Sequence, residues 1–494
     1  SNSMFLLVSS LSATVFSFLY RLIIGKLLLP DDFGIISTTI NFSVFFSVIS
    51  VFGFSFSIIK LIPEYLAKNQ KKNTDSFLSF SFKFMLFSSL VIAILLLIFS
   101  KIVSDFINIP QKAVYISSIL IMLITLATYF DSVLRGFQNM KLIAIMQIAG
   151  QFSKLFFAFV LILLGFGYLG PLFGFVALYF IMILIGLRLV KIKMKTIKFE
   201  SKNVLFDYSM PAFISTLLSY VFFSGKFIIL NALKTSSVTG IFSLANTMTA
   251  PIILIPSVLM QAIFPVSSEL ATKKKYTVTL TKAISYFLRY TLLITLPLAT
   301  FLAIFSKPLI LTFSRSEYLG SMELFPLLAT SSIIFSLGGI FYQTLYALGK
   351  TRIYRNIMLF SVILFLISSV LLTFKFSGLG MSIAVLIFST FYAVLSYIYL
   401  RKLINITIPF VSIGKVILST LITISMLLFL DSVNSGLIWA IISALISSVV
   451  YGMALIITRF FEKTDINLLK NLTMKIPFLK VYFNPVIEFL YKIV

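Results

Sequence analysis

Long apolar runs, separated by short polar or charged stretches, follow one another along the whole chain. Each run is about 20 residues or longer, and a helix of about 20 apolar residues crosses the hydrocarbon core of a bilayer. No long polar stretch offers room for a separate soluble domain. The pattern predicts an all-α integral membrane protein with fourteen spans, at residues 4–28, 34–60, 77–100, 113–134, 142–165, 169–190, 208–231, 239–262, 284–305, 325–347, 353–374, 379–400, 412–430 and 437–458.

Composition agrees with this pattern and removes several kinds of chemistry. The chain is 60% hydrophobic and 11% charged, far from the composition of an average soluble domain. It has no cysteine, which excludes disulfides and thiolate metal sites, and no histidine, the commonest metal ligand. We therefore expect no metal and no cofactor. The tail 459–494 mixes lysines with apolar residues, which predicts an interfacial amphipathic segment.

Positive charges predict the orientation of the spans. With the N-terminus inside, the inner connections and the tail hold 27 Lys and Arg residues, the outer connections hold 7, and six more lie within spans. Cytoplasmic loops of membrane proteins carry such an excess. We expect a multi-pass protein of the cell (cytoplasmic) membrane with both termini in the cytoplasm. The formal charge of +25 reflects this topology and does not indicate a nucleic-acid partner.

The chain contains an internal repeat. Phe33-Gly34-Ile35-Ile36-Ser37 recurs 206 positions later as Thr239-Gly240-Ile241-Phe242-Ser243, and Phe166–Gly170 recurs 210 positions later as Phe376–Gly380. Two further matches pair Glu64–Lys68 with Glu269–Lys273, and Gly136 and Lys141 with Gly349 and Arg352. Since the spacing equals six spans, the two repeats run in the same sense, which predicts a two-fold axis along the membrane normal and a central cavity. The predicted segments are a half 1–200, a half 201–405, two additional spans in 406–458 and the cytoplasmic tail 459–494.

Four stretches resemble one transporter family. They are Leu29-Pro30-Asp31-Asp32-Phe33-Gly34 after the basic Arg21, Tyr208-Ser209-Met210-Pro211, Gly240–Ala245 and Phe264–Glu269. The chain resembles the Wzx-type polysaccharide-biosynthesis flippases of the multidrug/oligosaccharidyl-lipid/polysaccharide (MOP) exporter superfamily. The resemblance implies the MATE-like fold of that superfamily. It also implies a transporter, not an enzyme, that flips a lipid-linked oligosaccharide by alternating access. The family often has an acid before a basic residue in span 7, where this chain has Gly225-Lys226.

Six cations lie within the predicted spans. Lys60, at the inner end of span 2, can reach the headgroups by snorkelling. Lys154 lies near the middle of span 5, and Gln147, Gln151 and Lys154 share one helical face. Charged groups at that depth usually face a cavity or a partner. Arg21 and Lys226, and likewise Lys83 and Arg289, occupy matching depths in the two repeats.

These residues predict a cationic cavity with Lys154 between two levels of charge. The candidate substrate-binding residues are Arg21, Lys83, Lys154, Lys226, Arg289, Gln147 and Gln151. Lysine and arginine with few acids nearby favour phosphate or pyrophosphate. Asp131 is the one clear acid within a span and the candidate residue for coupling to H⁺ or Na⁺.

The expected substrate is an oligosaccharide on a polyprenyl or dolichyl (pyro)phosphate, moved from the inner to the outer leaflet. The chain has no phosphate-binding loop of the Gly-rich type ending in Gly-Lys-Ser/Thr, so the membrane potential is the candidate driving force. Membrane lipids and glycan-assembly enzymes are the candidate partners, and a monomer is expected.

Two alternatives remain at this stage. One is another transporter of the superfamily, a peptidoglycan-precursor flippase or a multidrug exporter. The other is a membrane glycosyltransferase that uses Asp31 and Asp32 to hold a metal, although acids at the start of a helix also complement the helix dipole.

Overall fold

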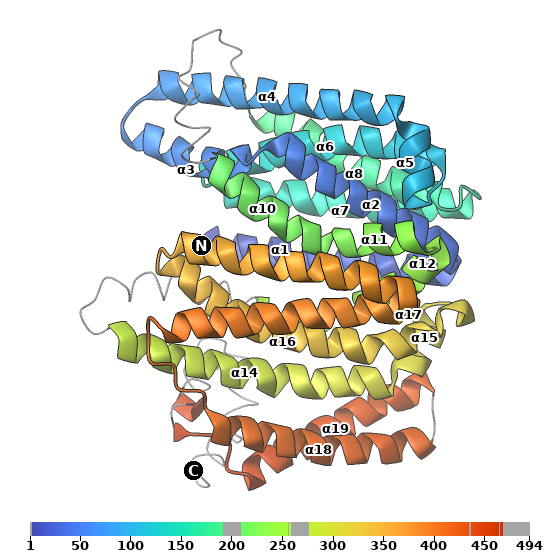
Figure 1. The fold of residues 1–494 in the computed structure, drawn as a ribbon, viewed down its shortest axis with the longest axis vertical. Helices are drawn as coiled ribbons and strands as arrows, with labels where there is room; N and C mark the ends of the chain where they lie inside the picture. The colour runs from blue at the N-terminus through green and yellow to red at the C-terminus, as the bar shows by residue number, and fades with distance from the viewer. Residues whose placement is uncertain are drawn as a thin grey trace. The chain divides into compact units, whose positions relative to one another are not determined.

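The structure, a computed structural model, describes residues 2–190, 209–254, 256–257, 276–433, 436–463 and 465–467. Within these ranges every regular element is a helix (Figure 1). In chain order the helices are α1 (Asn2–Leu27), α2 (Pro30–Val51), α3 (Phe54–Ala67), α4 (Lys71–Ile98), α5 (Ser100–Ile107), α6 (Gln111–Gly136), α7 (Met140–Leu163), α8 (Leu169–Leu189), α10 (Met210–Phe223), α11 (Gly225–Leu233), α12 (Ser236–Met248), α14 (Tyr276–Ile304), α15 (Ser306–Phe313), the 3₁₀ turn η2 (Ser316–Tyr318), α16 (Ser321–Ala347), α17 (Thr351–Arg401), α18 (Phe410–Val433) and α19 (Leu437–Ile457).

The helices are long and apolar enough for a multi-pass membrane protein. Ten of them in the described ranges can cross a bilayer, and the bent pair α10–α11 makes eleven if it counts as one span. The all-helical membrane fold is thus confirmed, whereas the number fourteen is not. Part of the difference lies in α17, where Ser377 has a non-helical φ of 55° and ψ of −131° at the predicted turn between two spans.

Several predicted spans are broken. The apolar run 34–60 is divided into α2 and α3, because Phe52 and Gly53 both have positive φ. Gly53 is held against the backbone of Ser209, and a Cβ at this glycine would lie 2.1 Å from the Ser209 carbonyl oxygen. A break of this kind leaves hydropathy unchanged, so the sequence pattern predicts one continuous span.

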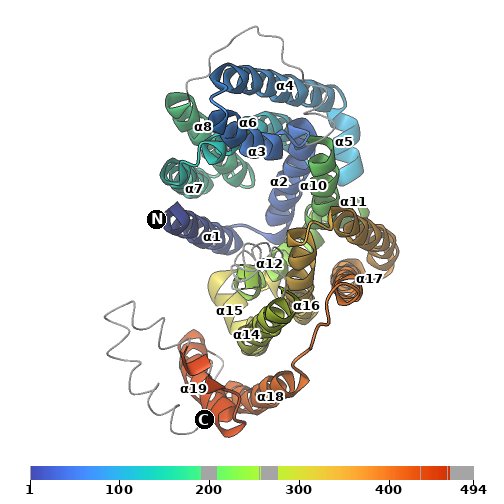
Figure 2. The ribbon, with the colours of Figure 1, turned by 90° about the vertical axis from the view of Figure 1, so that its left-hand side faces the viewer.

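The chain divides into two compact units, which are described separately. The first comprises residues 1–248, 313–328 and 355–391. In it α7 packs on α1 and α8, α6 packs on α2, α4 and α8, and α2 packs on α12. Helices α4, α6 and α8 run in roughly the same direction across the upper part of Figure 1, and Figure 2 shows the same group of helices turned by 90°.

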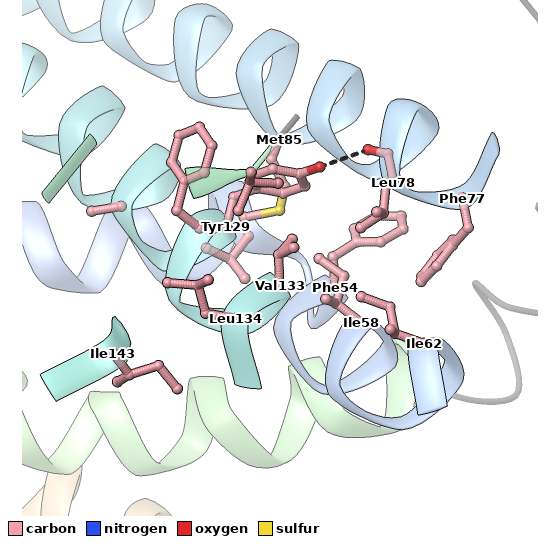
Figure 3. Close-up of a cluster of buried hydrophobic side chains, with 14 of the residues drawn as sticks. Phe54, Ile58, Ile62, Phe77, Leu78, Met85, Tyr129, Val133, Leu134 and Ile143 are labelled. Atoms are coloured by element: carbon pink, nitrogen blue, oxygen red, sulfur yellow. Dashed lines mark hydrogen bonds between the residues drawn. The ribbon is translucent and has the colours of Figure 1, made fainter. Parts of the chain in front are cut away.

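A large apolar cluster holds α3, α4 and α6 of this unit together (Figure 3). Phe54, Phe77, Met85 and Tyr129 in this cluster are fully buried, and the Tyr129 hydroxyl donates a hydrogen bond to the Leu78 carbonyl oxygen at 3.0 Å. Inside a bilayer the gain from such packing is van der Waals contact, since lipid tails are as apolar as the side chains. A buried hydroxyl must find an acceptor there, because no water is available to replace one.

The second unit comprises residues 249–312, 329–354 and 392–494. Its helices α18 and α19 pack against each other, and α18 packs on α14. Leu292, Val416, Tyr451 and Leu455 form part of the apolar contact, and the Tyr451 hydroxyl donates to the Leu293 carbonyl oxygen at 2.8 Å. Helices α18 and α19 lie where the two additional spans are predicted. The tail beyond residue 467 lies outside the described residues, and the predicted segments 1–200, 201–405, 406–458 and 459–494 stay predictions.

The internal repeat recurs in backbone geometry. Helices α14 and α15 end at Ile304 and Phe313, 206 residues after the ends of α4 and α5 at Ile98 and Ile107. Gly167 and Ser377, 210 residues apart, both have positive φ. Three residues further on, Gly170 and Gly380 each lie against the backbone of the preceding helix, at Ile162 and Leu372 respectively. The matched sequences therefore form the same helical hairpin in both repeats.

Two contacts in the first unit are reciprocal. A Cβ on Gly34 would lie 1.7 Å from the Ser236 carbonyl oxygen, and a Cβ on Gly240 would lie 1.8 Å from the Pro30 carbonyl oxygen. Ser236 and Gly240 are the residues 206 positions after Pro30 and Gly34. A contact that recurs with its partners exchanged is what a two-fold axis produces. The pseudo-two-fold relation between the repeats thus passes between α2 and α12.

Of the other matches, Glu269–Lys273 lies outside the described residues. The predicted pairing of Gly136 with Gly349 shifts by two residues. The turn after α6 has the same backbone hydrogen bonds as the turn after α16, and these bonds align Gln138 with Gly349, 211 residues apart.

Candidate functional site

Three of the predicted intramembrane cations come together in the first unit. Arg21 lies on α1, Lys154 on α7 and Lys226 on α11. The Lys154 and Lys226 side chains are buried, at 2% and 8% exposure, and Arg21 is partly buried. The charge of Arg21 acts on both Lys154 and Lys226, so Arg21 lies within electrostatic reach of each lysine. We call Arg21, Lys154 and Lys226 the cation cluster.

Lys154 is held between α1 and α8. Its Nζ donates a hydrogen bond to Ser17 Oγ at 3.3 Å and lies over the rings of Tyr20 and Phe175, at 4.7 and 5.1 Å from their centroids. Ring faces attract cations, so these contacts replace part of the hydration that the ammonium loses. Ser17 in turn donates to Gln151 Oε1 at 3.5 Å, which joins two of the predicted polar residues on α7 to one hydroxyl of α1.

Arg21 and Lys226 meet consecutive residues of α12. Arg21 Nη1 donates to Thr247 Oγ1 at 3.0 Å, and Lys226 Nζ donates to Asn246 Oδ1 at 2.7 Å. Arg21 comes from the first repeat and Lys226 from the second. The two side chains thus meet the same turn of α12, and the match of their depths in the membrane stays a prediction.

A bend in the chain positions Lys226. Helices α10 and α11 meet at Ser224 with an angle of 45°, and Lys226 lies in the first turn of α11. Its ammonium also lies over the rings of Phe222 and Phe227, at 5.6 and 5.3 Å. Interrupted helices of this kind place the positive N-terminal end of a half-helix inside the membrane, where it favours anions.

No carboxylate neutralises the cation cluster among the described residues. The hydrogen-bond acceptors of its three side chains are the oxygens of Ser17, Thr247 and Asn246, all uncharged. A cation in the membrane without a counter-ion costs a few kcal/mol even on lenient scales, about 2.5 to 3.5 each. An anion that enters the cluster would therefore gain both the Coulomb attraction and charge-assisted hydrogen bonds.

Gln147 and Asp131 form a separate polar group. Gln147 Nε2 donates to Asp131 Oδ1 at 3.1 Å, and Arg135 forms a salt bridge with Asp131 at 2.6 Å, one turn along α6. The Asp131 carboxylate is thus already paired with a cation. Its role in ion coupling stays a prediction.

The structure does not add Lys83 or Arg289 to the cluster. Lys83 is exposed on α4, which packs on α6, α3 and α2. Arg289, in the second unit, is 3% exposed and forms salt bridges with Glu462 at 2.6 Å and Asp465 at 3.0 Å. Two carboxylates already balance the charge of Arg289, so it offers no free positive charge to a substrate. A substrate role for either residue stays a prediction.

The sequence alone did not identify the polar partners of the cation cluster, Ser17, Asn246 and Thr247. Ser17 has a detectable signal, because it lies one helical turn before Arg21 on the same face of α1. Asn246 and Thr247 are polar residues within a predicted span, but nothing in the sequence connects them to Arg21 or Lys226, which lie 226 and 20 residues away respectively.

Comparison with known sequences decides the family. The family described as "Polysaccharide biosynthesis protein" matches residues 1–271, more than half of the chain. The chain belongs to the polysaccharide biosynthesis protein family. The predicted resemblance to a polysaccharide-biosynthesis family is thereby confirmed.

Relatives of this family member are distant. An uncharacterized membrane protein of Methanocaldococcus jannaschii is 23% identical over 407 residues, which cover 76% of this chain and 79% of the relative. Among solved structures, the lipid II flippase MurJ in an inward closed conformation matches with a TM-score of 0.74 and 16% identity. The match covers 92% of this chain and 98% of the MurJ chain. An inward-facing multidrug resistance MATE transporter of the MOP superfamily has a TM-score of 0.67 and 15% identity, over 79% of this chain and 94% of its own. At these identities the structures establish the fold alone.

Proposed function

We propose that the chain is a flippase that moves a polyprenyl- or dolichyl-linked (pyro)phosphate oligosaccharide from the inner to the outer leaflet by alternating access. The observation that carries the proposal is the cation cluster. Its two lysines are buried and its arginine is partly buried, its members come from both repeats, and no carboxylate among the described residues pairs with it. We assign its three side chains to the phosphate or pyrophosphate of the substrate.

The chemistry of each cation suits part of this task. The Arg21 guanidinium presents paired donors that match a phosphate bidentately, whereas Lys154 and Lys226 act as point charges. Lys154 and Lys226 already rest on neutral oxygens and ring faces. Because these partners are uncharged, a phosphate can replace or join them without first breaking an ion pair.

The main free-energy cost of flipping a glycan lipid is the transfer of its hydroxyl groups into hydrocarbon. Each hydroxyl that enters hydrocarbon without a partner costs several kcal/mol, about 4 to 8 on scales in which nothing can replace the hydrogen bond. A polar path between the two repeats would remove most of this cost while the lipid tail remains in the bilayer. The predicted central cavity, the cytoplasmic orientation of both termini and coupling to H⁺ or Na⁺ through Asp131 belong to this proposal.

The test is translocation by the purified full-length chain in vesicles. A fluorescent polyprenyl-pyrophosphate oligosaccharide is added, and its appearance in the opposite leaflet is followed by a quencher or a glycan-cleaving enzyme. Arg21→Gln, Lys154→Gln and Lys226→Gln should each slow transport by roughly tenfold or more, because a hydrogen bond to a charged group contributes about 1.5 to 3 kcal/mol. Lys141→Gln, an exposed cation on the same helix as Lys154, is the matched control and should leave the rate unchanged.

The same assay separates the alternatives. A peptidoglycan precursor and a cationic dye are offered in parallel vesicles. Preference for the peptidoglycan precursor would identify the sister function, and transport of the cation alone would point to a multidrug exporter. Full activity of all three cluster variants would overturn the role of the cluster.

A further inference from the structure

A second basic site belongs to the second unit, whereas the cation cluster belongs to the first. A half-open pocket of about 480 Å³ is lined by residues 281–282 of α14, by Arg401 at the end of α17 and by residues of the segment that follows it. Its lining includes the basic side chains of Lys282, Arg401 and Lys402, together with Thr281, Asn405 and Thr407. No acidic residue lines this cavity among the described residues. We call it the basic pocket.

Hydrogen bonds connect α14 to the segment after α17 at the basic pocket. They do not involve the basic side chains, which keep their donors for a ligand. Thr281 Oγ1 donates to the Asn405 carbonyl oxygen at 3.0 Å, and Ser285 Oγ donates to the Thr407 carbonyl oxygen at 2.7 Å. Within the described ranges, the charged groups of Arg401 and Lys402 lie over the rings of Tyr397 and Tyr399, at 6.0 and 5.6 Å from the ring centroids. The segment is thus fixed by its backbone, and its positive groups keep their hydrogen-bond donors available.

The end of the apolar helix α17 and its nearby tyrosines predict that the pocket lies at the depth of the lipid headgroups. Arg401 ends the apolar helix α17, and tyrosines such as Tyr397 and Tyr399 are enriched where a membrane meets water. Exposed apolar side chains flank the pocket along the chain. Val394 and Ile398 precede it, and Phe410 and Val411 follow it at 73% and 74% exposure. A ligand held here would have its charged part in the pocket and an apolar part available to the surrounding side chains.

The excess of positive charge in the connections predicts that this face is cytoplasmic, because Lys282 and Arg401 both lie in connections assigned to the inside. Basic pockets between membrane helices on that side typically bind the headgroups of anionic lipids. We propose that the basic pocket is a binding site for the phosphate of an anionic membrane lipid in the inner leaflet. The site does not depend on which head group the transporter flips.

Lipid binding to the delipidated full-length chain tests this proposal. Phosphatidylglycerol and phosphatidylcholine with the same acyl chains are titrated in neutral detergent, and bound lipid is counted by native mass spectrometry. The wild type should retain phosphatidylglycerol in preference to phosphatidylcholine. The variant Lys282→Gln/Arg401→Gln/Lys402→Gln should bind phosphatidylglycerol about tenfold more weakly or worse, since each basic residue near an anionic headgroup contributes about 1 kcal/mol. Its three side chains are exposed, so the fold should be retained, and size-exclusion chromatography verifies this.

The matched control is Lys68→Gln/Lys71→Gln/Lys72→Gln. It removes three exposed cations from another connection that is predicted to be cytoplasmic, and no described cavity is lined by them. It should bind phosphatidylglycerol as the wild type does. If this control lost as much phosphatidylglycerol binding as the pocket variant, the effect would come from total charge and not from the pocket, and the proposal would be overturned. Unchanged binding in the pocket variant would overturn it as well.

Inorganic phosphate distinguishes the source of the ligand. If the pocket holds a lipid, millimolar inorganic phosphate should not displace phosphatidylglycerol, because it brings no acyl chains to the flanking apolar side chains. Displacement by inorganic phosphate that depends on Lys282, Arg401 and Lys402 would show a site for a soluble anion and would overturn the assignment to lipid. The single variant Arg401→Lys should bind more weakly than the wild type if the guanidinium holds the phosphate bidentately.

Discussion

Arg21 and Arg289 are both arginines inside membrane helices of this chain, yet their surroundings differ in kind. Arg21 donates to the hydroxyl of Thr247. Arg289 meets the carboxylates of Glu462 and Asp465 and the Phe460 carbonyl oxygen. Because opposite charges cancel at contact distance, Arg289 ties the segment after α19 to α14. Arg21 has an uncharged partner in Thr247, and the proposed function assigns its charge to the substrate. The neighbours of each residue, and not its type or its depth, decide its role.

This difference predicts a large stability effect at Arg289. Arg289→Gln leaves the Asp465 carboxylate, 2% exposed, without its cation, and removal of one partner from a buried pair costs about 3 to 5 kcal/mol. We expect a marked fall in the melting temperature of the detergent-solubilised chain. The double variant Arg289→Gln/Asp465→Asn should recover part of the loss, since it removes the uncompensated charge.

The control is Arg315→Gln. Arg315 pairs with Glu317 at 3.6 Å and both side chains are about half exposed, so the melting temperature should not change measurably. A melting temperature for Arg289→Gln equal to that of Arg315→Gln would contradict a structural role for the buried network.

At the scale of elements, contacts through glycine set how helices of the two repeats approach each other. Helices α2 and α12 cross where Gly34 faces the Ser236 carbonyl oxygen and Gly240 faces the Pro30 carbonyl oxygen. Small residues permit such close backbone approach, which is the main source of packing energy between membrane helices. The two N-terminal ends on the side predicted to be extracellular are thus held together by a pair of equivalent contacts.

A single methyl group should disturb this crossing. Gly34→Ala places a Cβ 1.7 Å from a backbone oxygen, so the two helices must move apart. Overpacking of this kind typically costs about 1 to 3 kcal/mol, and we expect a lower melting temperature. Gly240→Ala should show a similar loss, because the contact is reciprocal.

Gly414→Ala on α18 is the matched control for this pair. Nothing lies within 4 Å of its added Cβ, and alanine favours a helix more than glycine does. Its melting temperature should be equal or slightly higher. A stable, wild-type-like Gly34→Ala protein would show that the α2–α12 contact is not tight in solution.

At the scale of the whole molecule, the proposed transport of an anion makes the membrane potential a driving force. The cation cluster can neutralise the phosphate in transit, but the substrate still delivers its charge from one side to the other. An inside-negative potential favours outward movement of an anion by roughly 2.3 kcal/mol per charge per 100 mV.

Flipping in vesicles should therefore respond to an imposed potential. With the chain in a defined orientation, a potassium diffusion potential negative on the cytoplasmic side should speed outward flipping of the pyrophosphate-linked glycan. Reversal of its sign should slow flipping, and collapse with an ionophore should give an intermediate rate. Rates that are independent of the potential would exclude this driver and leave coupling to H⁺ or Na⁺, with Asp131 as the first residue to substitute.

The sequence by itself determined the membrane class, the expected orientation and the internal repeat. These features depend on local hydropathy, on the count of charges in connections and on recurring short motifs, all of which can be read along the chain. The matched glycines Gly34 and Gly240 were visible in this way, and the structure gave them a physical reason. The helix breaks at Phe52–Gly53 and at Ser224 were not, because they leave the apolar pattern intact.

Only the tertiary structure decided which charges act together. Lys83 and Arg289 occupy equivalent positions in the two repeats, 15 residues before the ends of α4 and α14, but one is exposed and the other is buried between two carboxylates. Those carboxylates lie 173 and 176 residues further along the chain, and Thr247 lies 226 residues after Arg21. The electrostatic balance of a buried cation depends on neighbours that packing brings from such distances, and no local pattern in the sequence contains them.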